Sequence, residues 1–248
     1  MLSEERQSLI LDRLRMKRAV TVQELVQDLD SSAATIRRDL TELHNKGLLQ
    51  KVHGGAVSCD VDYFTTEPDI NTKASLFTEE KEAIAREAAS LIEDHDFIFI
   101  DAGTTTEHIL PYVKAQNVTF VTNGTSHAAF LAARHCRVIL LGGQVKAVTG
   151  AIIGDTALQQ LEVFNFTKGF FGANGVSIKG GFSTPDPAEA AIKAKAMQRC
   201  HHAYVLCDSS KFDTVSPITF ATLESATIIT TRVKGAYASY TTVREVLP

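Results

Sequence analysis

A series of short apolar runs constrains the fold of this chain most strongly. From Thr78 onward the runs alternate with helical segments, the clearest of which cover residues 79–92, 126–134 and 187–200. The runs are FIFID (97–101), VTFVT (118–122), RVILLG (137–142), GFFGA (169–173), AYVLC (203–207) and ATIIT (226–230). A continuous apolar run of this length is typical of a strand that is buried on both faces of a sheet. The alternation therefore predicts an α/β domain with a largely parallel sheet.

Small and polar residues follow five of these predicted strands, in the segments 101–106, 122–124, 142–143, 172–175 and 208–211. In parallel sheets, ligands bind beyond the carboxyl ends of the strands. Each segment alone is consistent with a plain turn, but five of them together favour a polar pocket. The candidate pocket residues are Asp101, Gly103, Thr104, Thr105, Thr106, Thr122, Asn123, Gly142, Gly143, Asn174, Gly175, Asp208 and Lys211.

The residue types in these segments indicate the chemistry of the ligand. The hydroxyl and N–H groups from Gly103 to Thr106, at a predicted helix start, form a natural anion site. Hydroxyls, glycine amides and Lys211 together suit a phosphate and several OH groups, so we expect a small phosphorylated polyol. The chain has no GxGxxG after a strand and no GxxxxGK[ST], which argues against a dinucleotide or a P-loop nucleotide. No cofactor is expected.

The first sixty residues predict three helices. Residues 3–16 carry an apolar stripe, and residues 21–29 open with a capping box formed by Thr21 and Glu24. After a short link, the third helix places Ile36, Leu40 and Leu43 on one face and ends near Gly47. Two helices, a tight turn and a further helix are the order of a helix-turn-helix motif.

The exposed side of the third helix is small, polar and cationic. In a helix-turn-helix, residues near the start of the last helix meet base edges in the major groove. The expected DNA contacts on this helix are Ser32, Ala34, Thr35, Arg37 and Arg38. Small residues permit close approach, Ala34 suits a thymine methyl group, and the arginines reach phosphates or guanine. Taken alone, the same surface is equally consistent with an ordinary solvated helix.

A β-hairpin follows the third helix. In LLQKVHGGAVS, apolar residues alternate around Gly54-Gly55, a turn signal between two short strands. The hairpin resembles the wing of a winged helix, and it carries Lys51 and His53 where they would touch the DNA backbone or minor groove. The first domain is therefore expected to be a winged helix-turn-helix.

Two sets of motifs resemble one family. TVQELVQDLDSS and TIRRDLTELHNKGLLQKVHGGA resemble the N-terminal domain of the DeoR family of bacterial transcription regulators, with Lys51 in place of a common arginine. DAGTTT, VTNG, LLGG, GANG and CDSSKF, in that order, resemble its C-terminal sensor domain, whose fold is similar to ribose-5-phosphate isomerase and CoA-transferase-like enzymes.

The resemblance implies what is sensed and where. It implies a repressor of the lactose or fructose phosphotransferase type that responds to a sugar phosphate. The phosphate would lie at Gly103–Thr106, and the residues around the sugar would be Asn123, Gly142, Gly143, Asn174 and Lys211.

Composition and spacing set the remaining expectations. We expect a DNA-binding domain over residues 1–57, a linker over 58–77 and a sensor domain over 78–248. No apolar run approaches a membrane span, the charged N-terminus has no signal-peptide core, and the four cysteines form no framework, so a cytoplasmic protein is expected. The net charge of −4 is uneven, because residues 1–57 carry nine Lys/Arg and eight Asp/Glu.

Three smaller features carry expectations of their own. Pro111 is expected to bend or shorten the helix that follows Thr106. Glu189 and Lys193 have the i,i+4 spacing that more often marks a surface ion pair than a site. The alternative is that Thr184 or Glu189, with the GGFSTPDP loop, closes over a ligand. The segments Cys200-His201-His202 and His135-Cys136 lack metal-ligand spacing, so no metal site is expected.

Two classes of function remain open at this point. The first is a regulator, a repressor or an activator, that binds double-stranded operator DNA as a homo-oligomer, a dimer or a tetramer, under control of a phosphorylated sugar. The second is an isomerase-like enzyme with an accessory DNA-binding domain, in which Asp101 and Asp208 act as bases and Lys211 as an electrophile.

Overall fold

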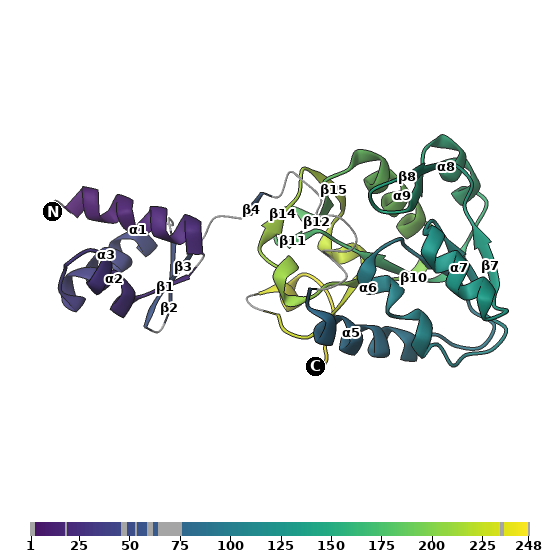
Figure 1. Cartoon of the computed structure of the whole chain (residues 1–248), viewed down its shortest axis with the longest axis horizontal. Coiled ribbons are helices and arrows are strands. Elements are labelled where there is room, and N and C mark those ends of the chain that lie inside the picture. Colours follow the sequence, from purple (N-terminus) through teal and green to yellow (C-terminus); the bar gives the residue numbers. More distant parts are fainter. Residues whose placement is uncertain are drawn as a thin grey trace. The chain divides into compact units, whose positions relative to one another are not determined.

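The computed structural model divides the chain into two compact units, Met1–Asp62 and Tyr63–Pro248, which are described one at a time (Figure 1). The structure describes residues 3–17, 19–45, 49–52, 54–58, 62–63, 76–233 and 236–247. None of the helices within these ranges is long and apolar enough to cross a membrane.

The N-terminal unit is a three-helix unit with a small antiparallel sheet. Its helices are α1 (Ser3–Lys17), α2 (Val22–Asp28) and α3 (Ala33–Asn45). Its strands are β1 (Ala19–Thr21), β2 (Leu49–Val52) and β3 (Gly55–Ser58), in the order β1-β3-β2. The predicted helix-turn-helix and its wing are therefore confirmed, while the third strand, β1, was not predicted. Its three residues are too few to show a period of two.

Local and long-range contacts fix the helices of this unit. The Thr21 hydroxyl accepts the N–H of Glu24 at 3.1 Å, and the Glu24 carboxylate accepts the N–H of Thr21 at 2.8 Å, which confirms the capping box. Arg6 of α1 donates to Asp39 of α3, with 2.5 Å between Nε and Oδ2, and Asp39 is fully buried. The predicted helix end at Gly47 lies outside the described residues.

The C-terminal unit is built on a seven-stranded parallel sheet with the order β17-β16-β13-β10-β5-β6-β7. Its strands are β5 (Phe97–Ile100), β6 (Thr119–Thr122), β7 (Arg137–Leu140), β10 (Phe166–Gly172), β13 (Cys200–Leu206), β16 (Thr227–Thr230) and β17 (Val243–Glu245). The first six of these coincide with the six predicted apolar runs, so the parallel α/β fold is confirmed.

Helices lie on both faces of this sheet, and the sheet separates the core into two apolar clusters. The helices of at least seven residues are α5 (Thr78–Ser90), α7 (Thr125–Ala133), α8 (Asp155–Leu161) and α9 (Pro187–Gln198). One cluster contains Phe99, Phe171 and Ile192, and the other contains Ile84 and Ile98. Because Ile98 and Phe99 are adjacent in β5, they point to opposite faces of the sheet, as a strand buried on both sides requires.

Several short antiparallel strands were not predicted. They are β8 (Gln144–Lys146) with β9 (Ala151–Ile153), β11 (Gly175–Ser177) with β12 (Gly181–Thr184) and β15 (Ile218–Ala221), and β14 (Thr214–Val215) with β4 (Asp62–Tyr63). Strands this short give too few alternating positions for a sequence signal. Along the chain, β8 and β9 follow β7, β11 and β12 follow β10, and β14 and β15 follow β13.

The segment after Gly103 confirms the expectation for Pro111. The helix α6 covers only Thr104–Glu107, and a 3₁₀ turn over Leu110–Tyr112 follows it. Proline cannot donate a backbone hydrogen bond, and it is tolerated in the first turn of the second element, where its position needs no such bond.

Candidate functional site

The first turn of α3 presents the smallest side chains of the candidate DNA surface. The Ser32 hydroxyl accepts the N–H of Thr35 at 3.2 Å and shares a hydrogen bond of 2.9 Å with the Thr35 hydroxyl. Ser32 therefore caps this end of the helix, and the two hydroxyls are held together. Ala34 is exposed beside them. The side chains at this helix end are therefore small, and the two hydroxyls are held in place before any DNA binds.

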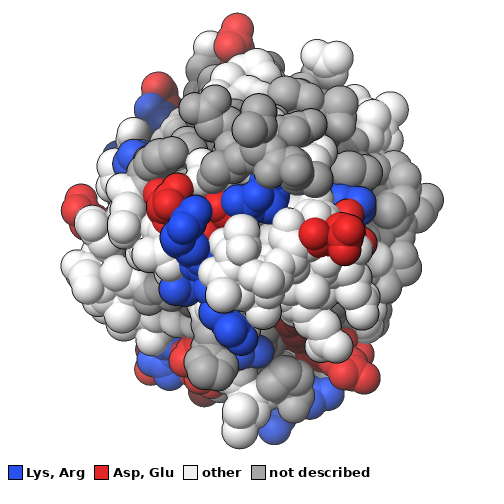
Figure 2. All heavy atoms as spheres, turned by 90° about the vertical axis from the view of Figure 1, so that its left-hand side faces the viewer, with Lys and Arg blue, Asp and Glu red and all other residues white. Residues whose placement is uncertain are grey.

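Arg37 and Arg38 of α3 are both exposed. Arg38 lies 3.7 Å from Glu42 in an i,i+4 pair whose side chains are 70% and 45% exposed. Such a solvated pair contributes little to stability, so the guanidinium can leave Glu42 for a phosphate at small cost. Figure 2 shows Lys and Arg side chains in a band across one face, with acidic groups at its sides.

The wing is fastened to α3 by Lys51. Its ammonium group donates to the Thr41 hydroxyl at 2.8 Å, and that hydroxyl donates to the Arg37 carbonyl at 2.8 Å. Lys51 is therefore held beside the cationic side of α3. The other wing candidate, His53, lies outside the described residues.

In the C-terminal unit, the end of β5 contains a buried ion pair. The Asp101 carboxylate accepts a hydrogen bond from the Lys193 ammonium group of α9 and another, at 3.1 Å, from the Gly172 N–H. Lys193 also donates to the Gly172 carbonyl at 3.0 Å. Burial raises the pKa of Asp101, while Lys193 and the Gly172 N–H act in the opposite direction. The pair joins the loops after β5 and β10.

The residues after β6 use their polar groups to hold neighbouring loops. The Asn123 side chain accepts the N–H of Ala102 at 2.8 Å and donates to the Ile152 carbonyl at 3.3 Å. The Thr122 hydroxyl donates to the Ile100 carbonyl at 2.6 Å. Both residues are buried, so they shape the site by positioning the segment that begins at Asp101.

A buried histidine supports the turn of threonines. Nε2 of His127, on α7, lies 3.3 Å from the Thr106 hydroxyl, which donates to the Gly103 carbonyl at 2.8 Å. Burial lowers the pKa of His127 to about 4, although a backbone hydrogen bond with Gly103 acts to raise it. His127 is consequently neutral at pH 7, and Thr104 and Thr105 are also buried beside it.

Backbone sterics account for several of the candidate glycines. Gly143 has a φ of +148°, and a Cβ there would lie 2.6 Å from the Ile153 carbonyl. A Cβ on Gly175 would lie 2.5 Å from the Thr214 carbonyl. Gly142 donates its N–H to Gln160 at 2.8 Å. Gly143 and Gly175 let neighbouring backbone segments approach each other closely, a role that requires no ligand.

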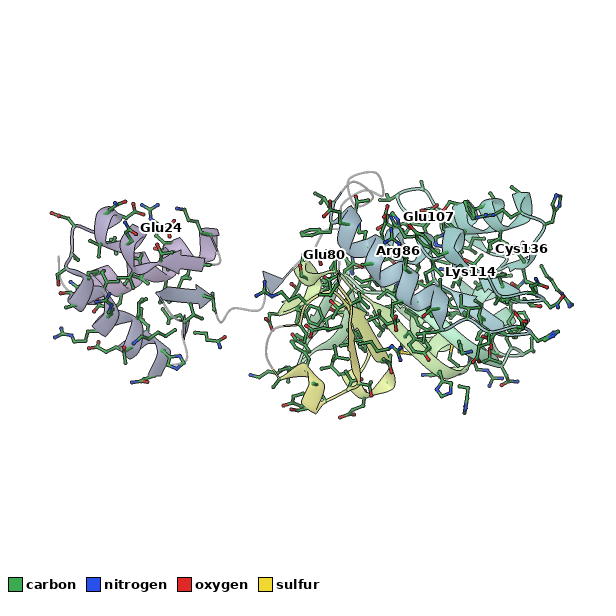
Figure 3. The ribbon with its side chains drawn as sticks, turned by 90° about the horizontal axis from the view of Figure 1, so that it is seen from below. Glu24, Glu80, Arg86, Glu107, Lys114 and Cys136 are labelled. Atoms are coloured by element: carbon green, nitrogen blue, oxygen red, sulfur yellow. The ribbon has the colours of Figure 1, made fainter. Side chains whose placement is uncertain are left out.

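The segment after β13 has a partly satisfied carboxylate. One oxygen of Asp208 accepts from the Ser210 N–H at 3.0 Å. The other, Oδ2, is buried with no hydrogen-bond partner in the described part of the chain and lies 3.8 Å from the Lys211 ammonium group. Glu80 of α5 accepts from the Ser209 N–H at 2.9 Å and from the Thr231 hydroxyl at 2.6 Å. Figure 3 labels Glu80 on α5.

The contacts with the Asp208 segment affect the pKa of Glu80 on α5. Partial burial acts to raise the pKa of Glu80, but the hydrogen bonds from Thr231 and Ser209 outweigh it and lower the pKa. The next residue, Lys81, is buried on the apolar side of α5. Its charge also contributes to the lowered pKa of His108, after burial.

The expected surface pair of Glu189 and Lys193 is wrong. Both residues are buried, at 6% and 4% exposed, and each is bonded to a partner outside α9. Glu189 accepts from Lys146 at 3.0 Å and from Thr149 at 2.8 Å, and Lys146 also lies 3.0 Å from Asp186. The hairpin of β8 and β9 is therefore clamped onto the start of α9. Spacing alone could not show which side of α9 faces the protein.

The structure thus brings most candidate sensor residues together at the carboxyl ends of the parallel strands, which we call the sensor edge. The segments after β5, β6 and β10 are directly bonded, and Asn174 accepts from Thr184 at 3.1 Å. Gly142 and Gly143 lie after the edge strand β7, two strands from β5. Sequence reasoning missed His127, because no local pattern signals its contact with the Thr106 hydroxyl. In the described ranges no group of three or more His, Cys, Asp or Glu side chains could hold a metal.

Two family models match the chain. The DeoR-like helix-turn-helix domain matches residues 6–62, and the DeoR C terminal sensor domain matches residues 76–232. The chain belongs to the DeoR family. This DeoR-family member is therefore a DNA-binding transcriptional regulator with a sensor domain, and the enzyme interpretation is not favoured.

Curated relatives match this DeoR-family chain over nearly its full length. It is 45% identical over 232 residues to the uncharacterized HTH-type transcriptional regulator FruR of Bacillus subtilis (strain 168), covering 93% of this chain and 92% of the relative. It is 36% identical over 228 residues to the lactose phosphotransferase system repressor of Staphylococcus aureus (strain N315), covering 91% and 90%.

Solved structures resemble the DeoR-family chain more distantly. Ribose 5 phosphate isomerase A from Neisseria gonorrhoeae superposes with a TM-score of 0.41 at 17% identity, covering 58% of this chain and 56% of the isomerase. The family assignment depends on the sequence matches.

Proposed function

We propose that the chain represses a sugar uptake or catabolism operon, and that binding of a phosphorylated sugar changes its affinity for the operator DNA. The polar segments that share one sheet edge, in a chain with a winged helix-turn-helix, carry this proposal. The lactose phosphotransferase system repressor relatives support the repressor role and the link to sugars. As a repressor of transcription, the protein would act in the cytoplasm.

The proposed division of labour follows the chain. Residues 1–57 bind double-stranded DNA, residues 58–77 link the domains, and residues 78–248 bind the effector. On the DNA side, Arg37 and Arg38 contact phosphates or guanine, and Lys51 contacts the backbone beside α3. His53 on the wing, and Ser32, Ala34 and Thr35 at the helix start, complete the proposed interface.

The proposed effector site lies at the carboxyl edge of the sheet. The phosphate is held by the turn from Gly103 to Thr106, whose hydroxyls and N–H groups suit an oxyanion. Lys211 supplies a cation, and Asn174 supplies an amide to the sugar hydroxyls. Asp101, Thr122, Asn123, Gly142, Gly143, Gly175 and Asp208 complete the site. The buried contacts of Thr122 and Asn123 support a role in holding its shape.

The proposal also requires more than one copy of the chain. A helix-turn-helix regulator reads two half-sites separated by about one helical turn of DNA, or by a multiple of it, with a symmetric dimer or tetramer. Effector binding would then favour one arrangement of the sensor domains, with a coupling of about 1–3 kcal/mol.

A gel-shift titration with the purified protein tests the function. The protein is expected to bind a duplex from its own promoter region more tightly than random duplex, with an affinity that falls with salt. A panel of sugar phosphates is expected to contain one that changes this affinity and raises the melting temperature. Equal affinity for promoter and random duplex at every salt concentration, with and without the panel, would contradict the proposal.

Lys211→Ala separates the two domains in the same assay. The variant is expected to bind operator normally and to lose the response to the sugar phosphate, because a charged hydrogen bond to phosphate contributes about 1.5–3 kcal/mol. Lys114→Ala is the matched control, since this exposed lysine precedes β6 and so lies toward the opposite edge of the sheet (Figure 3). Normal effector binding by Lys211→Ala would contradict the site assignment.

A further inference from the structure

The two outermost strands of the parallel sheet, β17 and β7, differ in how they are protected against pairing with another chain. At one edge, β17 carries Arg244, which donates to Glu87 at 2.8 Å, and Glu245, which accepts the N–H of Val233 at 2.7 Å. At the other edge, β7 exposes Ile139 at 36% and Leu140 at 41%, and it contains no acidic residue. Natural proteins protect edge strands with charges, and β7 has one, Arg137, at its start. The exposed apolar residues that follow Arg137 indicate a strand that another chain covers.

Among the described residues, no strand pairs with the outer side of β7, and the backbone groups on that side follow a fixed pattern. Leu141 donates its N–H to the Thr122 carbonyl at 2.9 Å, toward β6. Because the direction alternates along a strand, Ile139 also faces β6, whereas the N–H and C=O groups of Val138 and Leu140 point away from the sheet. In Figure 1, β7 lies at the outer margin of the C-terminal unit.

The helix beside this edge is also free of charge. α7 packs next to β7 and has the sequence TSHAAFLAA, in which the exposed residues are Ser126, Ala129, Ala132 and Ala133. Each of α1, α3, α5 and α9 carries several charged residues. The first charge beyond α7 is Arg134 at its C-terminal cap, whose guanidinium lies over the Phe130 ring at 5.3 Å. A helix surface of small uncharged residues next to apolar residues of an edge strand is characteristic of a buried interface.

We infer that β7 pairs antiparallel with β7 of a second copy of this chain, about a two-fold axis at Ile139. In this register Val138 exchanges hydrogen bonds with Leu140 of the partner subunit, and the seven-stranded sheets join into one. Ile139 meets Ile139 of the partner subunit as a non-hydrogen-bonded pair. The two α7 helices lie on the same face of the joined sheet, where small residues permit close packing.

Charge is compatible with this pairing. Arg137 is the charged residue of β7, and the two-fold axis places it opposite Leu141 of the partner subunit. The two Arg137 side chains then lie at opposite ends of the paired strands, roughly 13 Å apart along the strand direction. This separation exceeds the Debye length at physiological salt, so their repulsion is largely screened.

The inference deepens the proposed homo-oligomer by naming its surface, and cysteine cross-linking tests it directly. In the full chain with Cys59 and Cys136 replaced by Ser, Ile139→Cys is expected to form a disulfide-linked dimer under mild oxidation. Opposed Cα atoms of a non-hydrogen-bonded pair lie about 4.5 Å apart, within disulfide range. Val163→Cys is the matched control, because Val163 is 76% exposed and lies in the segment before β10, which is three strands from β7 in the sheet.

Charge substitution gives a second measurement. Ile139→Lys and Ile139→Glu place like charges opposite each other, so both are expected to halve the sedimentation mass while the melting temperature stays near that of the native protein. Cross-linking of Ile139→Cys at the level of Val163→Cys, or an unchanged mass in both charge variants, would overturn the interface. Failure of the proposed function would appear separately, in the promoter titration of the native protein.

Discussion

The two units of this regulator arrange their charges in opposite ways. The cations that are proposed to meet DNA are exposed, and Arg38 has only a solvated partner at 3.7 Å. At the sensor edge Asp101 and Lys193 are buried, and the ammonium group of Lys193 is bonded to both Asp101 and the Gly172 carbonyl. A surface that reads DNA must be accessible before DNA arrives, whereas an internal site must be held in shape by its own contacts.

The difference has an energetic consequence. Removing an exposed cation leaves little unsatisfied, because water replaces its partner. Removing one member of a buried pair leaves the other as an uncompensated charge. Variants of the DNA surface should therefore change binding at constant stability, while variants of the buried Asp101–Lys193 pair should change stability itself.

Lys193→Met is expected to have the largest effect on stability of the variants that test this comparison. It leaves the Asp101 carboxylate buried without its cation, so the free energy of unfolding is expected to fall by about 3–5 kcal/mol. Lys195→Met, on the same helix, removes an exposed pair with Glu162 at 3.1 Å and is expected to cost about 1 kcal/mol or less. Urea unfolding measures both. Equal losses in the two variants would remove the distinction between the buried and exposed pairs.

The buried His127 predicts a dependence of stability on pH. Its pKa is about 4 in the fold and about 6.5 in the unfolded chain, so between these values the unfolded chain binds a proton that the folded chain excludes. The stabilisation is complete above about pH 6.5 and is lost as the pH falls toward 4, by up to about 3 kcal/mol.

His127→Gln isolates this contribution from the other acid-sensitive groups. The variant keeps a polar group near Thr106 but cannot titrate in this range, so its stability is expected to fall less than that of the native protein between pH 6.5 and 4. Chemical denaturation at a series of pH values measures the difference. Parallel curves for the two proteins would show that His127 is not the cause.

Arg38→Ala gives the smallest expected effect and sharpens the other side of the comparison. Operator affinity is expected to fall by about 1 kcal/mol, roughly fivefold, with the slope of log affinity against log salt reduced by about one. Effector binding and the melting temperature should not change. Arg13→Ala is the control, because Arg13 lies on α1 and its partner at 3.4 Å, Asp28, has a side chain that is 34% exposed. A similar loss of affinity in both variants would contradict the assignment of α3.

Much of the fold followed from local patterns. The six apolar runs became neighbouring strands, and the capping box of Thr21 and Glu24 formed as its spacing requires. These features depend on residues a few positions apart, whose geometry is set by the periods of helix and strand. The rule that ligands lie at the carboxyl ends of parallel strands then located the candidate sensor edge without knowledge of side-chain contacts.

The sequence by itself therefore determined the winged helix-turn-helix, the parallel sheet and the edge where polar segments meet. Only the tertiary structure decided which charges pair there, because Asp101 and Lys193 are 92 positions apart and Lys146 and Glu189 are 43 apart. Local spacing suggested an exposed pair between Glu189 and Lys193, and it was wrong. Burial makes each of these side chains depend on whatever group the packing brings within reach, and no short-range pattern encodes that choice.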